Sequence, residues 1–265
     1  MKQIILLILI TFELFGAVVK SPVLSVDKEN QTLVIEAEKV DVGMSGFAVH
    51  TIAENHTSIL KNVVVTHFDA QTKKATLKMM EFVTLRNNAL PTGIWEIEKG
   101  DMVELAFGYS RALLVAPSEE IYHRVTKGVA IQWIHPDLFA TVLSFRGHPT
   151  PLKEDFEAMG IASSVGLLFV YLEKKLYTVD MQSFAILNIS EAPLTQDSLK
   201  LPFYSRVETI EANWFGEGSS ELDAYEPHYY ELLVHSNTKN EKLYEIIKNG
   251  DEKLHYLLDE FELGK

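Results

Sequence analysis

Residues 32–117 form a series of short apolar segments rich in β-branched side chains, and this series constrains the fold more than any other feature. The segments are separated by stretches rich in Gly, Asn, Asp and Pro, residues that favour tight turns. The expected strands are residues 32–37, 46–52, 58–66, 74–85, 102–107 and 111–116. Short strands at regular spacing with turns between them predict a small antiparallel β-barrel or sandwich.

From Ser118 onward the pattern changes to short helices mixed with strands. Ser118 precedes two glutamates, which is the arrangement of an N-cap with acidic residues near the positive end of a helix. A second helix is expected to start at His135 and Pro136, because proline is favoured at the first helical position. The continuous apolar run at 165–172 predicts a buried central strand. The other segments expected here are strands at 130–134, 176–181, 184–189 and 203–210 and a helix at 153–160.

The C-terminal part predicts helices at 221–235 and 239–261. In the last stretch apolar residues recur at spacings of four and three, as in a short coiled coil. The tripeptide Asn249-Gly250-Asp251 instead indicates a helix end, a turn and a new N-cap. Two interpretations therefore stand: a helix–turn–helix packed on its own chain, or the seam of a homodimer. The residues in this spacing are Leu243, Ile247, Gly250, Leu254, Leu257 and Phe261.

The first residues predict an exported protein. Lys2 precedes the apolar run at 4–12, and the small residues Gly16 and Ala17 follow. A membrane-spanning helix needs about 20 apolar residues, so this run is too short, and it is typical of a secretory signal peptide. An uncleaved N-terminal anchor and an ordinary buried segment are the alternatives. We expect a location in the periplasm, the outer membrane or the cell surface, without direct membrane insertion after signal cleavage.

Together the segments predict an α+β protein: a small antiparallel β-barrel or sandwich, then a small α/β domain and C-terminal helices. The expected organisation is a signal peptide at 1–17, a β-rich barrel-like domain at 30–117, an α/β domain at 118–212, and a linker with C-terminal helices at 213–265.

Composition excludes several classes of function. The chain has 24 Lys and Arg against 37 Asp and Glu, a formal charge of −13. It therefore has no basic surface for nucleic acid, and anionic lipid would repel it. The sequence contains no cysteine. Disulfides, zinc–thiolate sites, iron–sulfur clusters and thiol catalysis are excluded.

The polar residues best suited to catalysis or metal binding are His135, Asp137 and His148, and Asp180 could join this cluster. His135 and His148 flank a helix about 18 Å long, so they should not share a metal ion. Helix capping is the simpler interpretation. Because no nucleophile or phosphate-binding motif accompanies them, we expect no catalytic residue, no cofactor and no metal.

An aromatic and acidic stretch follows in the C-terminal third. It could bind a cationic partner or a sugar, or it could be an amphipathic helix that packs its aromatic side chains onto the domain. Within it His228 and Glu231 share a helix face, but packing beside the tyrosines is favoured over metal binding. The stretch contains Trp214, Phe215, Tyr225, Tyr229 and Tyr230 among Glu217, Glu221, Asp223 and Glu226.

Six segments of the chain carry a family resemblance. They are VGMSGFAVH (42–50), ALPTGIWEIEKGDMVEL (89–105), ALLVAPSEEIY (112–122), IHPDLFATVLSFRGHP (134–149), SVGLLFVYLEKKLYTVDMQSFAIL (164–187) and LPFYSRVETI (201–210). None of these patterns is a catalytic signature. With these segments, which together span about 170 residues in the expected order, the chain resembles the N-terminal domain of the bacterial plasminogen-binding protein A family.

This resemblance implies a non-enzymatic protein of the bacterial envelope or surface, with plasminogen as the partner and a C-terminal lysine as its contact. Lys265 is the matching residue here. Its ammonium and carboxylate would suit the acidic and aromatic lysine sites of kringle domains. The better-known members carry a long Lys/Glu-rich helical extension, and this chain is expected to be a short member without it.

Three functions are therefore compared. The first is a surface binding protein that docks plasminogen through Lys265. The second is a periplasmic or outer-membrane structural or accessory protein that binds another envelope component. The third is a hydrolase that uses Asp137 or His148 of the α/β part.

Overall fold

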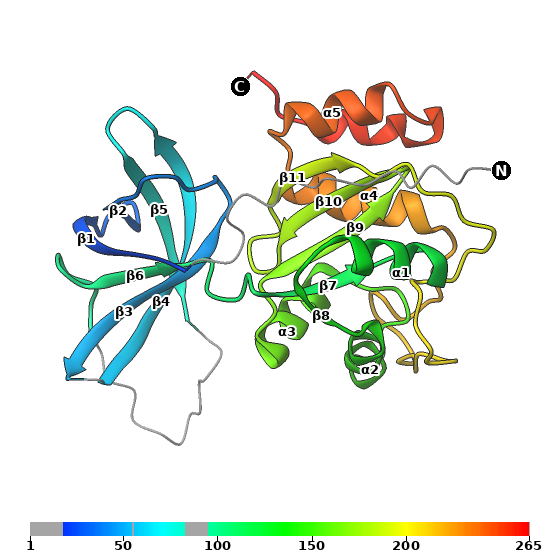
Figure 1. Cartoon of the computed structure of the whole chain (residues 1–265), viewed down its shortest axis with the longest axis horizontal. Helices are drawn as coiled ribbons and strands as arrows, with labels where there is room; N and C mark the ends of the chain where they lie inside the picture. Colours follow the sequence, from blue (N-terminus) through cyan, green and yellow to red (C-terminus); the bar gives the residue numbers. More distant parts are fainter. Residues whose placement is uncertain (1–17, 55, 83–94, 265) are drawn as a thin grey trace. The chain divides into compact units, whose positions relative to one another are not determined.

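The computed structural model describes residues 18–54, 56–82 and 95–264, which divide into two compact units, residues 18–109 and 110–264 (Figure 1). The expected signal peptide and Lys265 lie outside the described residues. Among the described residues there is no helix with the length and apolarity that a membrane crossing requires.

In the described part of the first unit, six strands close into a barrel in the order β1-β2-β5-β4-β3-β6. Every neighbouring pair is antiparallel. This confirms the expected antiparallel barrel. The strands are β1 (Val19–Asp27), β2 (Thr32–Glu36), β3 (Ser45–Ala53), β4 (His56–Asp69), β5 (Lys74–Glu81) and β6 (Met102–Leu105).

The barrel interior follows from alternation along the strands. In β2, Leu33 and Ile35 are buried and their neighbours are less so, and β5 alternates in the same way. Where β3 meets β6 the backbones approach so closely that only glycine fits. A Cβ on Gly46 would lie 2.1 Å from the carbonyl oxygen of Glu104. Alternate residues of each strand face the interior, and one glycine allows β3 and β6 to approach closely. These two features specify this wall of the barrel.

The sixth barrel strand is a correction to the sequence prediction. Residues 111–116 were expected there, but the strand at Arg111–Val115 belongs to the second sheet, and β1 takes its place. Four of the five residues at 111–115 are buried, the pattern of a strand covered on both faces. Segment β1 gave a weak signal because it holds Lys20, Pro22 and two serines. Its pairing with β2 and β6 is what closes the barrel.

The second unit is a five-stranded mixed sheet in the order β11-β10-β9-β7-β8. Strand β7 is parallel to β8 and β9, and β9, β10 and β11 form an antiparallel meander. The predicted buried strand is β9, the middle strand of the sheet. The barrel, this second sheet and the helices together confirm the α+β class. The strands are β7 (Arg111–Val115), β8 (Gln132–Ile134), β9 (Leu167–Leu172), β10 (Lys175–Asp180) and β11 (Ile186–Glu191).

Helices pack around this sheet: α2 on α3 and β7, and α4 on β9 (Figure 1). Ser118 caps α1 by accepting a hydrogen bond from the Ile121 N–H, as predicted. Helix α2 starts at Pro136 and ends at Gly147 in the left-handed conformation. The helices are α1 (Glu119–Gly128), α2 (Pro136–Arg146), α3 (Lys153–Ser163), α4 (Tyr225–Ser236), α5 (Glu241–Lys248) and the 3₁₀ helix η1 (Glu252–Glu260).

The strand expected at 203–210 does not form. Phe203, Tyr204 and Ser205 are buried, but the backbone that follows them is irregular. The Arg206 N–H donates to the side chain of Asp137 at 2.8 Å instead of entering a strand ladder. A side-chain acceptor on the distant helix α2 takes the place of a sheet partner.

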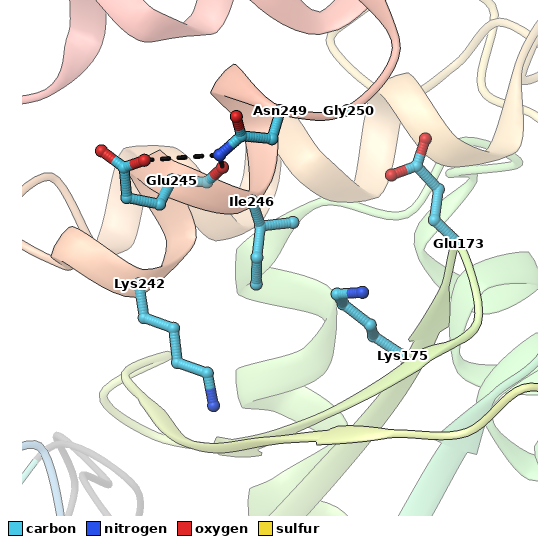
Figure 2. Close-up of a pocket in the computed structure, with 7 residues that line it drawn as sticks. All are labelled: Glu173, Lys175, Lys242, Glu245, Ile246, Asn249 and Gly250. Carbon is cyan, nitrogen blue, oxygen red and sulfur yellow. Dashed lines mark hydrogen bonds between the residues drawn. The ribbon is translucent and has the colours of Figure 1, made fainter.

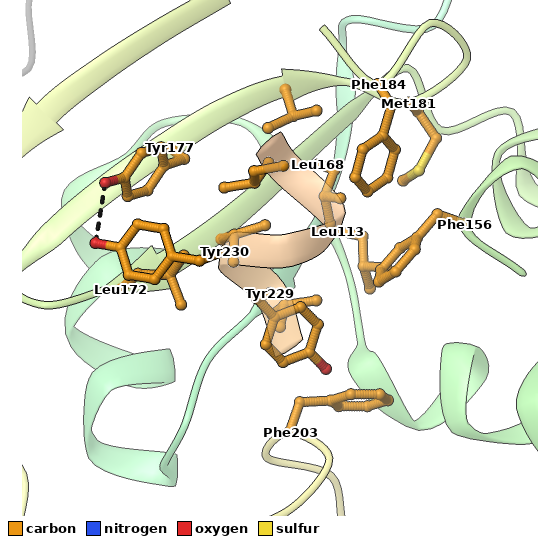
Figure 3. Close-up of a cluster of buried hydrophobic side chains, with 14 of the residues drawn as sticks. Leu113, Phe156, Leu168, Leu172, Tyr177, Met181, Phe184, Phe203, Tyr229 and Tyr230 are labelled. Carbon is orange, nitrogen blue, oxygen red and sulfur yellow. Dashed lines mark hydrogen bonds between the residues drawn. The ribbon is translucent and has the colours of Figure 1, made fainter. Parts of the chain in front are cut away.

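The core of the second unit is rich in large aromatic side chains (Figure 3). Phe139 lies between Phe156 and Phe203, with ring centroids 4.5 and 5.3 Å away. The hydroxyls of Tyr177 and Tyr230 are 3.2 Å apart. Buried tyrosines with paired hydroxyls therefore join the sheet to α4.

The C-terminal segment is a helix–turn–helix on its own chain, as the tripeptide Asn249-Gly250-Asp251 indicated. Helix α5 ends at Lys248, and the Asp251 side chain caps η1 by accepting from the Lys253 N–H at 3.0 Å. Four of the regularly spaced apolar residues are buried in the core of this unit. A homodimer through these helices stays a prediction. The buried residues are Leu243, Ile247, Leu254 and Leu257.

Candidate functional site: an exposed aromatic and acidic loop

His135 and Asp137, the first polar pair predicted from sequence, brace the start of α2. His135 Nδ1 accepts from the Asp137 N–H at 3.2 Å, which is the expected capping role. Asp137 in turn accepts from the Arg206 N–H, Nε and Nη2 at 2.7–2.8 Å. Partial burial alone would raise the pKa of Asp137. The Arg206 donors and the neighbouring His135 outweigh it, so the pKa lies below its ordinary value.

This pair does not form a serine–histidine dyad with the nearby Ser205. In such a dyad the serine hydroxyl donates its proton to an imidazole. Here the buried Ser205 Oγ donates to the Asp137 carboxylate at 3.3 Å, and the imidazole nitrogen that faces Asp137 accepts from the backbone. The arrangement tethers the irregular segment after Phe203 to α2.

His148 lies past the other end of α2, so it is not brought to His135. It joins Glu154 and Asp155, and potential ligand atoms of these three side chains lie within 4.8 Å of one another. Asp155 is fully buried, and its oxygens accept from Arg146 Nε, from His148 Nδ1 at 2.9 Å and from the Leu152 N–H at 2.7 Å. Arg146 also pairs with Glu154 at 2.6 Å. The guanidinium therefore supplies the positive charge that a metal ion would bring.

Asp180 and His228 also have structural partners. The side chain of Asp180 accepts from the N–H groups of Gln182 and Ser183, at 3.0 and 2.7 Å, in the turn after β10. His228 Nε2 donates to the Pro151 carbonyl at 2.8 Å, so this nitrogen does not face a metal site with Glu231. The polar residues grouped in the sequence analysis therefore lie at three separate places: His135 with Asp137, His148, and Asp180.

The three tyrosines of the aromatic stretch are buried, as the packing interpretation predicted. The hydroxyl of Tyr225 donates to main-chain carbonyls of β7 and β9, at 3.2 Å each. The hydroxyl of Tyr229 donates to the Pro202 carbonyl at 2.8 Å. These tyrosines therefore hold α4 on the sheet and are not available to a ligand.

A pocket of about 380 Å³ lies between the β9–β10 turn and α5 (Figure 2). Its charged side chains already have partners in the chain. Lys242 donates to the Ile189 carbonyl at 2.8 Å, and Lys175 pairs with Glu191 at 3.2 Å. Glu173 accepts from the Tyr230 hydroxyl at 3.0 Å. Because these groups are satisfied, the pocket offers little that would select a ligand. The residues around it are Glu173, Lys175, Lys242, Glu245, Ile246, Asn249 and Gly250.

The other two aromatic residues of the stretch are almost entirely exposed. Trp214 is 99% exposed and Phe215 is 88% exposed. Phe145, near the end of α2, is 93% exposed. Helix α2 carries apolar residues on two faces, but only one face can pack on the sheet. This pattern in the sequence could have indicated that Phe145 is exposed. Phe139 and Leu143 are buried, whereas Leu138 is more than half exposed.

The loop at residues 211–220, called the Trp214 loop here, is tied to the end of α2. The Asn213 N–H donates to the Gly147 carbonyl at 2.9 Å, and its side-chain amide donates to the Arg146 carbonyl at 2.7 Å. Gly147 is required twice, because its φ is 75° and a Cβ there would lie 2.2 Å from Asn213 Cγ. The start of the loop is therefore fixed to the C-terminal end of α2.

A second anchor holds the far end of the Trp214 loop. The Thr150 N–H donates to the Gly218 carbonyl at 3.1 Å, and Thr150 Oγ1 donates to the Ser220 carbonyl at 2.7 Å. Trp214 and Phe215 thus lie on a short span between two fixed points.

The surroundings of the loop are acidic. Residues 207–224 contain no Lys, Arg or His. Five exposed carboxylates lie in this segment, and none of them forms an ion pair with another described residue. They are Glu208, Glu211, Glu217, Glu221 and Asp223.

Comparison with known proteins gives one consistent result. The family model for the N-terminal region of plasminogen-binding protein PgbA matches residues 18–233. Proteins described as plasminogen-binding protein PgbA, from Helicobacter pylori strains J99 and 26695, are each 28% identical over 223 residues. The aligned region covers 82% of this chain and 47% of either relative, so the chain spans about half the length of the curated relatives it matches. No solved structure matches.

Proposed function

The chain belongs to the PgbA N-terminal family, and from this premise we propose that it is an exported, non-enzymatic binding protein of the bacterial envelope or surface that docks plasminogen. The observation that carries the proposal is the family match, which begins at residue 18 and runs through both units. Its start directly follows the segment expected to be a signal peptide, which supports export.

The proposed absence of catalysis is supported by how the reactive side chains are used. The Asp137 carboxylate holds Arg206, and the Asp155 carboxylate holds Arg146 and His148. A general base must have a free lone pair directed at a substrate proton. These carboxylates direct theirs at neighbouring donors of the chain.

We further propose Lys265 as the plasminogen contact when it carries the free C-terminal carboxylate. An ammonium and a carboxylate on one residue can pair with opposite charges while the aliphatic stem lies on an aromatic surface. The partner would supply acidic and aromatic side chains, and this chain would supply the lysine.

The test compares plasminogen binding by residues 18–265 with binding by residues 18–264. We expect binding to fall at least about tenfold in the shorter form, a loss of about 1.4 kcal/mol or more. A soluble lysine analogue should compete only with the longer form. The matched control is Lys253→Ala, which removes an exposed lysine of the same C-terminal segment and should leave binding unchanged. Absence of binding by both forms would refute plasminogen as the partner.

The second candidate is an accessory protein that binds another envelope component, as predicted from sequence. The observation that favours it is the nearly complete exposure of Trp214 and Phe215 on an anchored loop. Cross-linking in cells followed by purification of the mature protein would test it, with Trp214→Ala as the comparison. A partner captured equally by both forms would exclude the loop as its contact.

A further inference from the structure

We propose that the Trp214 loop is a docking surface for an extended, cationic segment of a partner protein that carries lysine or arginine side chains. This goes beyond the proposed plasminogen contact and does not depend on it. At Lys265 the chain would offer a cation to a partner, whereas at this loop the chain offers aromatic rings and carboxylates to a cation.

The first support is the unusual exposure of large apolar side chains. Trp214, Phe215 and Phe145 are each at least 88% exposed, whereas the tyrosines of neighbouring α4 are buried. Leaving such side chains in water forgoes the free energy that their burial would supply. Neighbouring exposed apolar side chains such as Trp214 and Phe215, with polar residues around them, mark interaction sites.

The second support is that the loop is held in place. Asn213 ties its start to the end of α2, and Thr150 ties its far end through two hydrogen bonds. A loop that is ordered before it binds loses less conformational entropy on association. The tryptophan is thus presented by a fixed frame on which a partner can be positioned.

The third support is the charge around the rings. The five carboxylates of residues 207–224 have no ion-pair partner among the described residues, and the segment has no cation of its own. A lysine or arginine could lie over the face of Trp214, the best aromatic for a cation, while a carboxylate pairs with its charge. A cation–π contact is stronger when the partner covers it and removes water.

The same charges argue against other occupants. Phospholipid phosphates would meet unpaired carboxylates and be repelled. A neutral sugar would remove water from these carboxylates without supplying an opposite charge. A cationic peptide segment satisfies the rings and the carboxylates together.

The test measures the affinity of the mature protein for a fluorescent peptide of alternating lysine and glycine, by fluorescence anisotropy. We expect the double change Trp214→Ala and Phe215→Ala to weaken binding about tenfold. Trp95→Ala, which removes a half-exposed tryptophan of the barrel unit, is the matched control and should bind as the unchanged protein does. Equal weakening in the control would overturn the proposal.

A second pair of variants separates local charge from net charge. Glu211→Gln with Glu217→Gln should weaken binding and reduce its dependence on salt. Glu29→Gln with Glu54→Gln makes the same change in net charge at exposed sites of the barrel unit and should have little effect. If both pairs weaken binding equally, the peptide is attracted by the overall charge of −13 and the loop is not a site.

Two further measurements identify the ligand chemistry. Acetylation of the peptide lysines should abolish binding, and undiminished binding would overturn recognition of a cation. Vesicles of zwitterionic phospholipid should not bind. Binding to them that depends on the loop would mean that the surface docks on a membrane and not on a peptide segment. The form ending at Gly264 should bind the peptide as well as the form ending at Lys265. Loss of peptide binding in the shorter form would place the contact at the terminus.

Discussion

The two units of this protein are stabilised by different kinds of side chain. Among the described residues, the buried interior of the barrel unit consists mainly of aliphatic side chains such as Leu33, Ile35 and Val63. The interior of the second unit holds stacked phenylalanines, hydrogen-bonded tyrosines and the fully buried carboxylate of Asp155. Alternation of apolar and polar residues along the strands is enough to form the core of the barrel unit. The core of the second unit also requires hydrogen bonds between specific buried polar groups.

One ion pair from each unit shows how burial changes the contribution of a charge. In the barrel unit Lys20 and Glu104 pair at 2.6 Å on the surface, where such a contact contributes little. In the second unit Arg146 and His148 both depend on the Asp155 carboxylate, which water cannot reach. Substitution of Asp155 should therefore cost far more stability than substitution of Glu104.

The largest expected effect comes from Asp155→Ala, which removes the common acceptor of Arg146, His148 and the Leu152 N–H. Breaking a buried pair by removing one partner costs about 3–5 kcal/mol. Denaturant unfolding with peptide-resolved hydrogen exchange should show lost protection within residues 110–264 and not in the barrel. Glu154→Ala, which removes the exposed partner of the same arginine, should cost at most about 1 kcal/mol. Equal losses for the two variants would contradict the comparison.

Gly46→Ala should be the most damaging single methyl in the barrel. The added Cβ would lie 2.1 Å from the Glu104 carbonyl oxygen and 2.7 Å from Leu105 Cα, so β3 and β6 must separate. We expect a loss of about 3 kcal/mol, seen as faster hydrogen exchange in these two strands. Gly128→Ala meets no atom within 4 Å and serves as the control. An unchanged unfolding free energy for Gly46→Ala would show that β3 and β6 can separate at less cost than their close approach indicates.

Tyr230→Phe tests the hydrogen-bonded tyrosines. The change leaves the buried Tyr177 hydroxyl without its partner at 3.2 Å and removes a donor to Glu173. An unsatisfied buried group costs about 1–3 kcal/mol, measured as a shift in the unfolding free energy. Tyr256→Phe, at an exposed tyrosine, should stay within about 0.5 kcal/mol. If both changes are neutral, the hydroxyl pair contributes nothing and the core is held by packing alone.

The stability of the second unit should fall as the pH drops below about 6.5. Burial lowers the pKa of His228, against the opposing effects of the Pro151 carbonyl and Glu231. Near the ordinary histidine pKa, about 6.5, the unfolded chain therefore binds a proton before the folded one does, and stability declines until the pH reaches the folded pKa. His228→Gln should flatten this part of the curve of unfolding free energy against pH. An unchanged slope in the variant would assign the dependence to other groups.

The smallest effect is expected at the proposed docking loop. Trp214→Ala should change the unfolding free energy by less than about 0.5 kcal/mol, because the ring is 99% exposed. Thermal unfolding would check this, and it also establishes that lost peptide binding in the double variant is not lost folding. A clear destabilisation would mean that the ring packs against the chain in solution.

The sequence alone predicted most of the elements, because their signals are local. Turn residues between alternating strands indicated a barrel or sandwich, and Ser118 and Pro136 marked helix starts. The resemblance of six segments to a known family also indicated the family, which the family match confirms. The errors came where an element depends on a distant partner. The strand at Arg111–Val115 was assigned to the barrel, and β1 was missed.

The candidate site shows the same limit. Trp214, Phe215 and the nearby acids could be identified from sequence as one stretch, but not which of its aromatic residues face water. The tyrosines of α4 are buried because Val115, Tyr171 and Pro202 supply acceptors for their hydroxyls. The exposure of Phe145 was not predicted, although the apolar residues on two faces of α2 could have indicated it.

By itself, then, the sequence determined the chain's acidity, its lack of thiol chemistry, the positions of its turns and caps, and its family. The first three depend on composition or on residues within a few positions of each other, and the family was indicated by the resemblance of six segments. Only the tertiary structure decided which strand closes the barrel, that Asp155 holds Arg146 and His148, and that Trp214 and Phe145 are exposed. Each of these depends on a contact between distant segments, which is fixed only when the whole core has packed.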